Sequence, residues 1–447
     1  DELRRWEPPR EPEVASLSSD AVQRAAQAAL AAAPPGAIES LSLFLPTREM
    51  PRAGVSVSTD KDARDWGITT TGDLTPSRPT DWTDFVAALH MNLNMPGLIG
   101  YFVVGLAGVA MIALALSGLL AHPRIFRDAF TLRWGGSARL QEADLHNRLS
   151  VWSLPFNFAV SLTGAYFGLI SALLYLVAAI GFHGDMSKLT APMAPPAIAE
   201  DATPAPLPAF GALIARVRAD ELHAEPFSIS VTHPGSRGQA ITIYATTPRH
   251  LRYGEQYYVS PDGTLGRVGF AEGDLGQRLY GAAYPLHFGS FGGLPVKLLY
   301  GALGLALCVI TASGVNVWLA RRRDQNRPAP IAARLWAVTV WGAPIAIIVA
   351  ALACMVSALP PLAMFWLTLF SCFIAAATRI DGKIWRVACG LGLTALGGLH
   401  LALYATRGAP LASIIDAALC LAGFIMVAPM RPRVSAVSGV QTTTWSA

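Results

Sequence analysis

The sequence has few charged residues and few cysteines, and both shortages narrow the class of protein. Charged side chains make up 14% of the 447 residues, against about 25% in soluble domains. No Cys-x-x-Cys pair occurs, and all five cysteines fall inside apolar runs: Cys308, Cys354, Cys372, Cys389 and Cys420. Disulfides, zinc fingers and iron–sulfur clusters therefore find no support. The low charge, with 53% hydrophobic residues, indicates an integral membrane protein.

Several motifs of soluble enzymes are also missing. There is no Gly-x-Gly-x-x-Gly or phosphate-binding loop, so we expect the chain itself to bind neither a nicotinamide cofactor nor ATP. There is no Gly-x-Ser-x-Gly or His-Glu-x-x-His, which argues against a hydrolase or a zinc protease. The net charge of +4 is small and concentrated in short loops, so it informs topology and does not predict nucleic-acid binding.

Seven apolar runs are long enough to cross a lipid bilayer. The first, Leu98–Leu120, has no charged residue in 23 positions, and a helix of that length spans a hydrocarbon core of roughly 30 Å. The other six cover approximately residues 151–180, 296–320, 332–357, 361–378, 385–405 and 410–430. Strict alternation puts every arginine-rich connection on one side, which marks that side as cytoplasmic.

This topology places residue 1 outside and the C-terminus in the cytoplasm. The first residues, DELRRWEPPREPEV, carry no signal-peptide pattern. We therefore expect an additional, earlier span that this sequence does not contain.

Two polar segments lie outside the predicted spans and follow one plan. In residues 1–89 the pattern predicts a helix over 18–33 and strands over 40–45 and 54–59. In residues 181–290 it predicts a helix over 209–218 and strands near 226–232, 239–246 and 255–260. We expect two small α+β modules on one side of the membrane, opposite the arginine-rich loop.

The predicted fold class is mainly α: a polytopic helical membrane protein with about seven spans and two small α+β extramembrane modules. We divide the chain into a first module, two spans with their arginine-rich loop, a second module, a third span and a four-helix extension. These parts cover residues 1–89, 90–180, 181–290, 291–325 and 326–447.

Two of the spans are built to one plan, each preceded by a Leu-His pair. His90 precedes Gly118 by nearly the same interval as His287 precedes Gly314, and each of these glycines follows a serine. Such a repeat suggests a duplicated unit. Two further histidines, His122 and His146, lie at the inner ends of the first two spans.

Three segments resemble the PepSY-associated transmembrane proteins, a family that includes bacterial ferric-siderophore reductases of the inner membrane. They read SGLLAHPRIFRDAFTLRW, DLHNRLSVWSLPFNFAVSLTG and LHFGSFGGLPVKLLYGALGLALCVITASGVNVWLARRR. The segment QYYVSPDGTLGRV resembles the closing hairpin of a PepSY domain, whereas the first module lacks the usual Asp-Pro-x-Gly ending. The resemblance covers about residues 1–325, and it implies periplasmic modules in an inner-membrane protein. Family members begin with an Arg-x-x-His helix, which is absent from this sequence.

Histidines at membrane edges are functional candidates, because two imidazoles from facing helices can hold a haem iron. We predict that His90 and His287 bind one haem b, with Gly97, Gly292 and Gly293 allowing a porphyrin close to the backbone. His146 or His122 would bind a second haem on the cytoplasmic side. The arginines predicted to pair with its propionates are Arg124, Arg127 and Arg148.

Each of these features also has a structural interpretation. A single histidine at a membrane boundary often serves only as a polar anchor. For His400, inside an apolar run, a helix–helix hydrogen bond is favoured over a ligand role. The Ser-Gly and Thr-Gly pairs in the spans predict close helix packing, and the structural interpretation is also preferred for Asp416, which lies near the outer end of its span.

Two main functions follow. The first is a haem reductase that passes electrons from an unidentified cytoplasmic donor to a periplasmic acceptor, by resemblance a ferric siderophore, for iron release. The second is a siderophore permease, or a binding and regulatory membrane protein without a redox cofactor. A third function is inhibition of periplasmic proteases, because some PepSY domains resemble inhibitors, but these residues give it no direct support.

Overall fold

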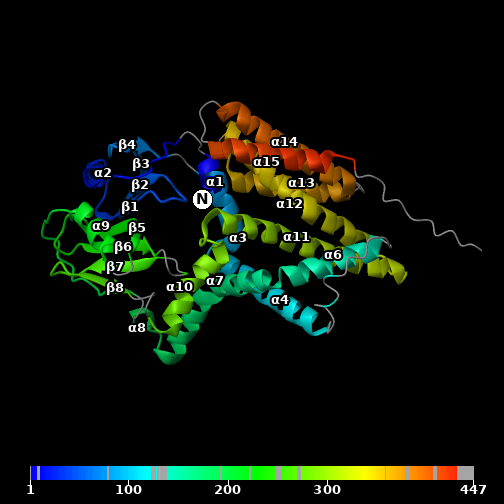
Figure 1. Cartoon of the computed structure of the whole chain (residues 1–447), viewed down its shortest axis with the longest axis horizontal. Coiled ribbons are helices and arrows are strands. Elements are labelled where there is room, and N and C mark those ends of the chain that lie inside the picture. The colour runs from blue at the N-terminus through cyan, green and yellow to red at the C-terminus, as the bar shows by residue number, and fades with distance from the viewer. Residues whose placement is uncertain are drawn as a thin grey trace, which may run out of the picture. The chain divides into compact units, whose positions relative to one another are not determined.

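The structure is a computed structural model in which long apolar helices accompany one antiparallel sheet (Figure 1). It describes residues 2–7, 11–77, 80–121, 127, 130, 138–191, 194–220, 223–247, 251, 254–268, 273–357, 359–377, 382–405 and 410–429. The predicted fold class, a polytopic helical membrane protein with α+β parts, is confirmed.

A helix is found at each of the seven predicted spans, with bounds that differ by only a few residues. Six are long and apolar enough to cross a membrane, and the seventh, α13, has 16 residues. The helices are α4 (Ile99–Ala121), α7 (Leu154–Gly181), α11 (Gly293–Asp324), α12 (Pro330–Ser357), α13 (Pro361–Ala376), α14 (Gly382–Tyr404) and α15 (Pro410–Val427).

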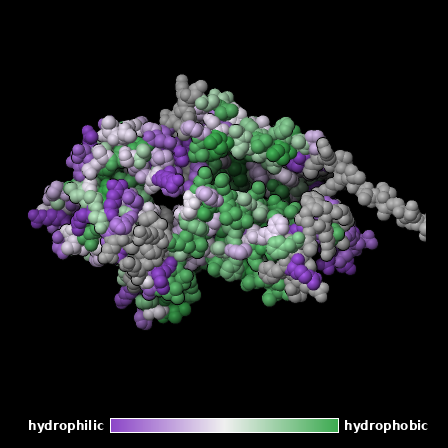
Figure 2. Space-filling view, viewed as in Figure 1, coloured by the Kyte–Doolittle hydropathy of each residue, from purple (hydrophilic) through white to green (hydrophobic). Residues whose placement is uncertain are grey.

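The surfaces of these helices require lipid. Leu114, Leu298 and Phe424 are between 66% and 71% exposed, and leaving such side chains in water is costly. Figure 2 shows hydrophobic residues gathered over the helical parts and hydrophilic residues over the sheet. The chain is therefore a multi-pass membrane protein.

The strands that the structure describes form one eight-stranded sheet in the order β4-β3-β2-β1-β5-β6-β7-β8. Two helices, α2 (Ser19–Ala31) and α9 (Phe210–Arg218), cover it, and Leu43, Phe210 and Ile229 are fully buried in the shared core. The strands are β1 (Ile38–Phe44), β2 (Ala53–Thr59), β3 (Ala63–Ile68), β4 (Leu74–Pro76), β5 (Glu225–Thr232), β6 (Ala240–Thr246), β7 (Glu255–Val259) and β8 (Leu265–Val268).

The two predicted modules are joined along β1 and β5. These strands pair antiparallel, with Leu43 opposite Ile229 and Leu41 opposite Val231. Strands of alternating polarity bury one face and leave the other polar, and the sequence of each module shows that alternation. It does not show that the two sheets share an edge.

A short helix precedes each of the two repeated spans. Helix α3 (Asp81–Asn92) ends with Leu93 in a left-handed conformation, at φ 56°, and α10 (Leu275–Phe288) ends with Gly289 at φ 63°. Each helix therefore stops sharply before the membrane helix that follows it. His90 and His287 lie in the last turns of α3 and α10, which agrees with a repeated unit.

Contacts along the chain divide it into two compact units. One comprises Asp1–Leu114, Phe158–Ala302 and Tyr404–Ile414, and contains the sheet, α3 and α10. The other comprises Ala115–Asn157, Leu303–Leu403 and Ile415–Ala447, and contains the arginine-rich loop and most of α12–α15. The structure also describes the shorter helices α1 (Glu2–Trp6), α6 (Ala138–Trp152) and α8 (Met186–Thr190).

Helices α4 and α7 approach closely at their glycines. A Cβ added to Gly108 would lie 2.9 Å from the backbone of Ala165 and of Ser161, and one added to Gly105 would meet Leu169 at 2.8 Å. The repeat-related glycines of α11, Gly301 and Gly304, have no atom within 4 Å of such a Cβ. Small residues at 105 and 108 thus permit the contact, whereas those in α11 have no equivalent neighbour.

Candidate functional site

His90 and His287 lie next to each other, although they come from the two different copies of the repeat. Their ring centroids are 6.0 Å apart, and the two ring planes are inclined at 33°. Each ring comes from the last turn of a helix that leads into a membrane span, α3 for His90 and α10 for His287. The ring of His90 is exposed and that of His287 is half-buried.

His287 is oriented by a hydroxyl on α7. Its Nδ1 is 2.9 Å from Thr163 Oγ1, and that hydroxyl donates its own proton to the carbonyl of Ala159 at 2.7 Å. The hydroxyl therefore accepts a hydrogen bond from Nδ1–H of His287, which leaves Nε2 as the unprotonated nitrogen. The rings of Phe167 and Phe288 stand edge-on to it, with centroids at 5.6 and 5.1 Å.

Burial lowers the pKa of His287, and the neighbouring imidazole of His90 lowers it further, while a hydrogen bond with the Val160 backbone acts against both. A lower pKa favours the neutral imidazole at physiological pH. The neutral ring is the form that ligates metals.

His146 on α6 contacts α11 in the same way. Its Nδ1 is 2.9 Å from the carbonyl oxygen of Ile310 and 3.1 Å from Ser313 Oγ. A Cβ on Gly314 would lie 3.1 Å from Cε1 of this ring, and one on Gly164 would lie 3.2 Å from Cε1 of His287. In both places a hydroxyl contacts Nδ1 and the following glycine leaves room for Cε1.

This arrangement corrects our interpretation of the Thr163–Gly164 and Ser313–Gly314 pairs. We expected them to serve close helix packing, and the structure places a histidine ring against each pair. The available sequence signal is that a hydroxyl residue precedes the glycine in both spans. Nothing in that signal identifies the histidine that fits there.

Comparison with known proteins now gives the family. The family model described as the PepSY-associated TM region matches residues 1–321. The chain belongs to this family. The predicted resemblance is thereby confirmed, and the match ends within α11, so that α12–α15 lie beyond it.

One relative of this PepSY-associated protein is Uncharacterized protein PA4219 of Pseudomonas aeruginosa. It is 30% identical over 253 residues, which are 54% of the present chain and 64% of the relative. The matched region therefore spans less than two thirds of that relative's length.

The arginines predicted near the second haem differ in their surroundings. Arg148 is buried and forms an ion pair with Asp144 at 3.2 Å, one helical turn earlier on α6. Arg127 is exposed. His122 and Arg124 lie outside the described residues.

The three predicted glycines precede the repeated spans in left-handed conformations, with φ between 65° and 70°. A Cβ on Gly97 or Gly293 would have no atom within 4 Å, whereas one on Gly292 would meet the side chain of Val296. The backbone at Gly97 and Gly293 is thus open to a neighbour. The role of these histidines, arginines and glycines in haem binding stays a prediction.

A further histidine contact lies beyond the family match, between α14 and α15. His400 Nδ1 lies 2.9 Å from Asp416 Oδ2, and both side chains are buried, with 1% of each residue exposed. The predicted helix–helix hydrogen bond of His400 is confirmed. Among the residues that the structure describes, no group of three or more His, Cys, Asp or Glu side chains could hold a metal ion.

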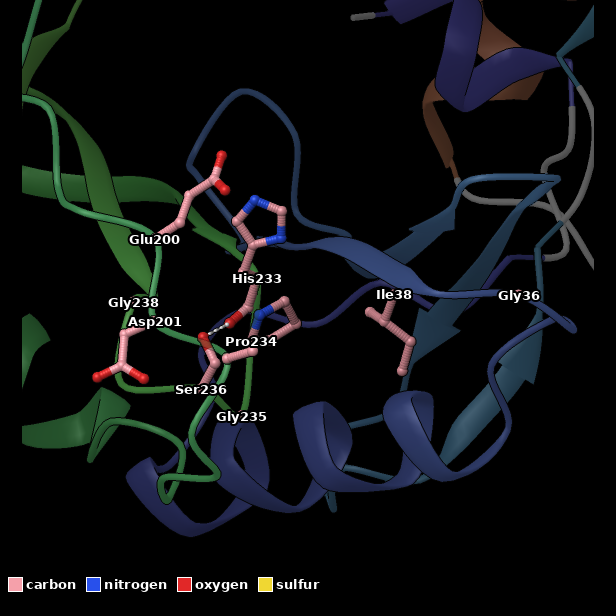
Figure 3. A pocket seen from close by; sticks show the side chains of 10 residues that line it. Gly36, Ile38, Glu200, Asp201, His233, Pro234, Gly235, Ser236 and Gly238 are labelled. Atoms are coloured by element: carbon pink, nitrogen blue, oxygen red, sulfur yellow. Dashed lines mark hydrogen bonds between the residues drawn. The ribbon is translucent and has the colours of Figure 1, made fainter.

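The sheet of this family member also carries a pocket of about 600 Å³ (Figure 3). Gly36 and Ile38 line it at the start of β1, and His233 lines it just after β5. Glu200 and Asp201 line it from the segment that precedes α9. The Ser236 hydroxyl donates to the carbonyl of His233 at 2.8 Å. Hydrogen bonds from Thr203 lower the pKa of Asp201, so this carboxylate in the pocket lining is charged at neutral pH.

Proposed function

We propose that this PepSY-associated membrane protein is a haem-b electron-transfer protein in which His90 and His287 would hold one haem. The observation that carries this proposal is the 6.0 Å separation of their rings. The two rings come from equivalent helices of a repeated unit, so a pair of like ligands arises directly from the duplication.

The separation agrees with two imidazoles on one iron. A metal–imidazole bond is about 2.0–2.1 Å long, and adding the half-width of each five-membered ring places the ring centres roughly 6 Å apart. Gly97 and Gly293, at the start of the two spans, have no atom within 4 Å of an added Cβ. The residues present therefore fit a porphyrin held between two histidines.

The chain's own residues prepare this site in three ways. Thr163 accepts from Nδ1–H of His287, so the unprotonated Nε2 is available as the ligand. Burial lowers the pKa of His287, which favours the neutral ring. Phe167 and Phe288 restrict its rotation by edge contacts on two sides. A bound haem would supply the one-electron chemistry, alternating between ferric and ferrous iron.

We further propose a second haem at His146. Its support is the repeated arrangement on α11, where the Ile310 carbonyl and Ser313 fix Nδ1 as Thr163 does for His287. The partner ligand of His146 and the propionate partners are predictions that rest on the sequence. A membrane core of roughly 30 Å is long for transfer through one cofactor, which favours two.

Orientation and acceptor follow from the arginine-rich connections and from the family. The basic loops predict which side of the protein is cytoplasmic. The protein would lie in the inner membrane of a bacterium, and its sheet would face the periplasm. We propose electron entry from a cytoplasmic donor and reduction of a periplasmic acceptor, a ferric siderophore. Reduction to Fe(II) weakens binding by hard oxygen ligands and would release the iron.

The test is an absorbance spectrum of the purified full chain, oxidised against dithionite-reduced. We expect a reducible b-type spectrum, and the loss of one haem per chain in both His90→Ala and His287→Ala. His183→Ala is the matched control, because His183 is exposed and lies outside the site. Unchanged haem content in the first two variants would reject the assignment.

A second function, a siderophore permease or a binding protein without a redox cofactor, is favoured by one observation. Helices α12–α15 lie beyond the family match and bury an ionisable pair, His400 and Asp416. Ionisable residues inside membranes often mark transport paths. Colourless protein with siderophore-dependent uptake would support this function over the first.

A further inference from the structure

Residues Glu2–Glu7 connect the two copies of the repeat, and we call them the bridging segment. They comprise α1 and the glutamate that follows it. At one end Glu7 contacts α3, the helix that carries His90. At the other end Glu2 contacts α11, the span that follows the helix carrying His287. Both histidines of the candidate site are therefore linked to one short stretch of chain.

Glu7 caps the first turn of α3 from a distant part of the sequence. Its Oε1 accepts from the backbone N–H of Trp82 at 2.9 Å, and its Oε2 accepts from that of Thr83 at 2.8 Å. The residue at the cap position itself, Thr80, makes no side-chain capping hydrogen bond. The first N–H groups of a helix have no partner within it, and the helix dipole also favours a carboxylate there. Glu7 thus supplies a cap that Thr80 does not provide.

Packing strengthens the contact at the same end of α3. Trp6 is 2% exposed, and its ring lies edge-on to that of Trp82, with centroids 5.5 Å apart. The buried residues of α3 are Trp82, Thr83 and Phe85, all at its N-terminal end, whereas His90 in the last turn is exposed. His90 lies about 12 Å further along the helix axis than Trp82. Its place is therefore set mainly at the end of α3 that the bridging segment holds.

The other end of the bridging segment contacts the second copy of the repeat. Glu2 Oε1 lies 2.8 Å from Lys297 Nζ on α11, and the lysine side chain is only 20% exposed. Water and salt screen such a partly buried pair less than a pair on the open surface. One turn later on α11, the Tyr300 hydroxyl donates to the carbonyl of Leu286 at 2.8 Å, and Leu286 directly precedes His287. The ion pair therefore joins the bridging segment to the part of the second copy that holds His287.

We propose that Glu7 and Glu2 are positioning residues, which hold α3 near the second copy of the repeat so that His90 and His287 stay close enough to hold one haem. This inference rests on the proposed haem function. Two helices that are already held in place lose less freedom when a ligand binds between them. Loss of the link should therefore weaken His90, the exposed partner, as a ligand before it affects His287.

The first experiment titrates haem into the purified full chain and records the absorbance. We expect Glu7→Ala to weaken haem binding about tenfold, or ~1.4 kcal/mol. It should also shift part of the ferric haem from a six-coordinate low-spin to a five-coordinate high-spin spectrum, because His90 is lost as a ligand while His287 remains. Glu7→Gln keeps one accepting oxygen, so its effect should be smaller.

Ser18→Ala is the matched control for Glu7→Ala. It removes the side-chain cap of α2, a helix that covers the sheet and carries no predicted haem ligand. We expect this variant to lose stability without a change in the haem spectrum. An unchanged spectrum in Glu7→Ala, or an equal change in Ser18→Ala, would overturn the proposal.

The contact at the other end is tested by exchanging its charges. Lys297→Glu places two carboxylates together and should produce the same kind of spectral change as Glu7→Ala. Adding Glu2→Lys restores an ion pair of opposite sense and should recover the spectrum of the unaltered protein. No effect of Lys297→Glu, or no recovery in the double variant, refutes the role of this pair.

Amide hydrogen exchange tests the link without any haem. In the haem-free protein we expect Glu7→Ala to accelerate exchange throughout α3, from Trp82 to the turn of His90, and Ser18→Ala to leave it unchanged. Faster exchange confined to the first turn, or no change at all, contradicts the positioning role. Absence of haem from the unaltered protein is a different result, because it rejects the proposed function, and the exchange measurement then still decides whether Glu7 fixes α3.

Discussion

His400 and Asp416 show how a membrane protein accommodates ionisable residues. The two side chains come from α14 and α15, are buried, and meet at 2.9 Å. A polar group at this depth is expensive unless it has a partner. Close approach of the helices makes the pairing possible, since a Cβ on Gly397 would lie 2.6 Å from the backbone oxygen of Asp416.

We predict that Asp416→Ala destabilises the helical extension by about 1–2 kcal/mol, near the upper end of measured helix–helix hydrogen bonds in membranes. His400→Ala should cost a similar amount, and the double variant clearly less than the sum of the two, because the pair is lost only once. Thermal unfolding in detergent measures the three values. Strictly additive costs would mean that the contact contributes nothing.

At the scale of single residues, the sequence predicts part of the candidate site but not all of it. The juxtaposition of His90 and His287 follows from the repeat, since equivalent positions in a duplicated unit tend to lie at equivalent places. Thr163 could not be identified in advance, because its partner His287 is 124 residues away and a Thr-Gly pair is equally typical of plain helix packing. The same holds for Ser313 and His146.

At the scale of elements, α4 and α7 illustrate how glycine position determines a helix contact. Gly105 and Gly108 lie against α7, whereas Gly301 and Gly304 of the repeat-related α11 have open space beside them. The repeat can therefore be recognised in the sequence, but the repeat-related helices α4 and α11 do not make equivalent contacts at these glycines. Helix bounds were predictable because apolar length defines them, and helix partners were not.

We predict that Gly108→Ala destabilises the protein by about 1–3 kcal/mol, the usual cost of overpacking, since the new Cβ would lie 2.9 Å from two backbone atoms of α7. Gly304→Ala is the repeat-matched control. It should be neutral or slightly stabilising, because alanine is the better helix former and no atom lies within 4 Å. Melting temperatures in the same detergent compare them, and equal losses would contradict the proposed α4–α7 contact.

At the scale of the whole molecule, the shared sheet is the feature that sequence patterns could not reveal. Each half shows its helix and its alternating strands, as predicted. The pairing of β1 with β5 joins the two halves of the sheet. The alternation of polar and apolar residues does not indicate which strand lies at an edge, so this pairing could not be predicted. The two halves also share one core of buried side chains, from Val22 on α2 to Tyr257 on β7.

We predict that the eight strands unfold together. Ile243→Ala on β6 removes a fully buried side chain and should cost about 2–5 kcal/mol. Amide hydrogen exchange should then accelerate not only in β6 but also in β2, at Val55 and Val57, which belong to the other half of the sheet. Faster exchange confined to β5–β8 would show two independent modules instead.

The β1–β5 pairing also has a consequence for how the chain is made. Leu43 pairs with Ile229, which the ribosome adds only after it has completed α4 and α7. At roughly 5–20 residues per second, this delay is about 10–40 s. During that interval α4 and α7 must be inserted into the membrane, while the edge of β1 that pairs with β5 has no partner strand. Biogenesis of this protein therefore couples completion of the sheet to successful insertion of α4 and α7.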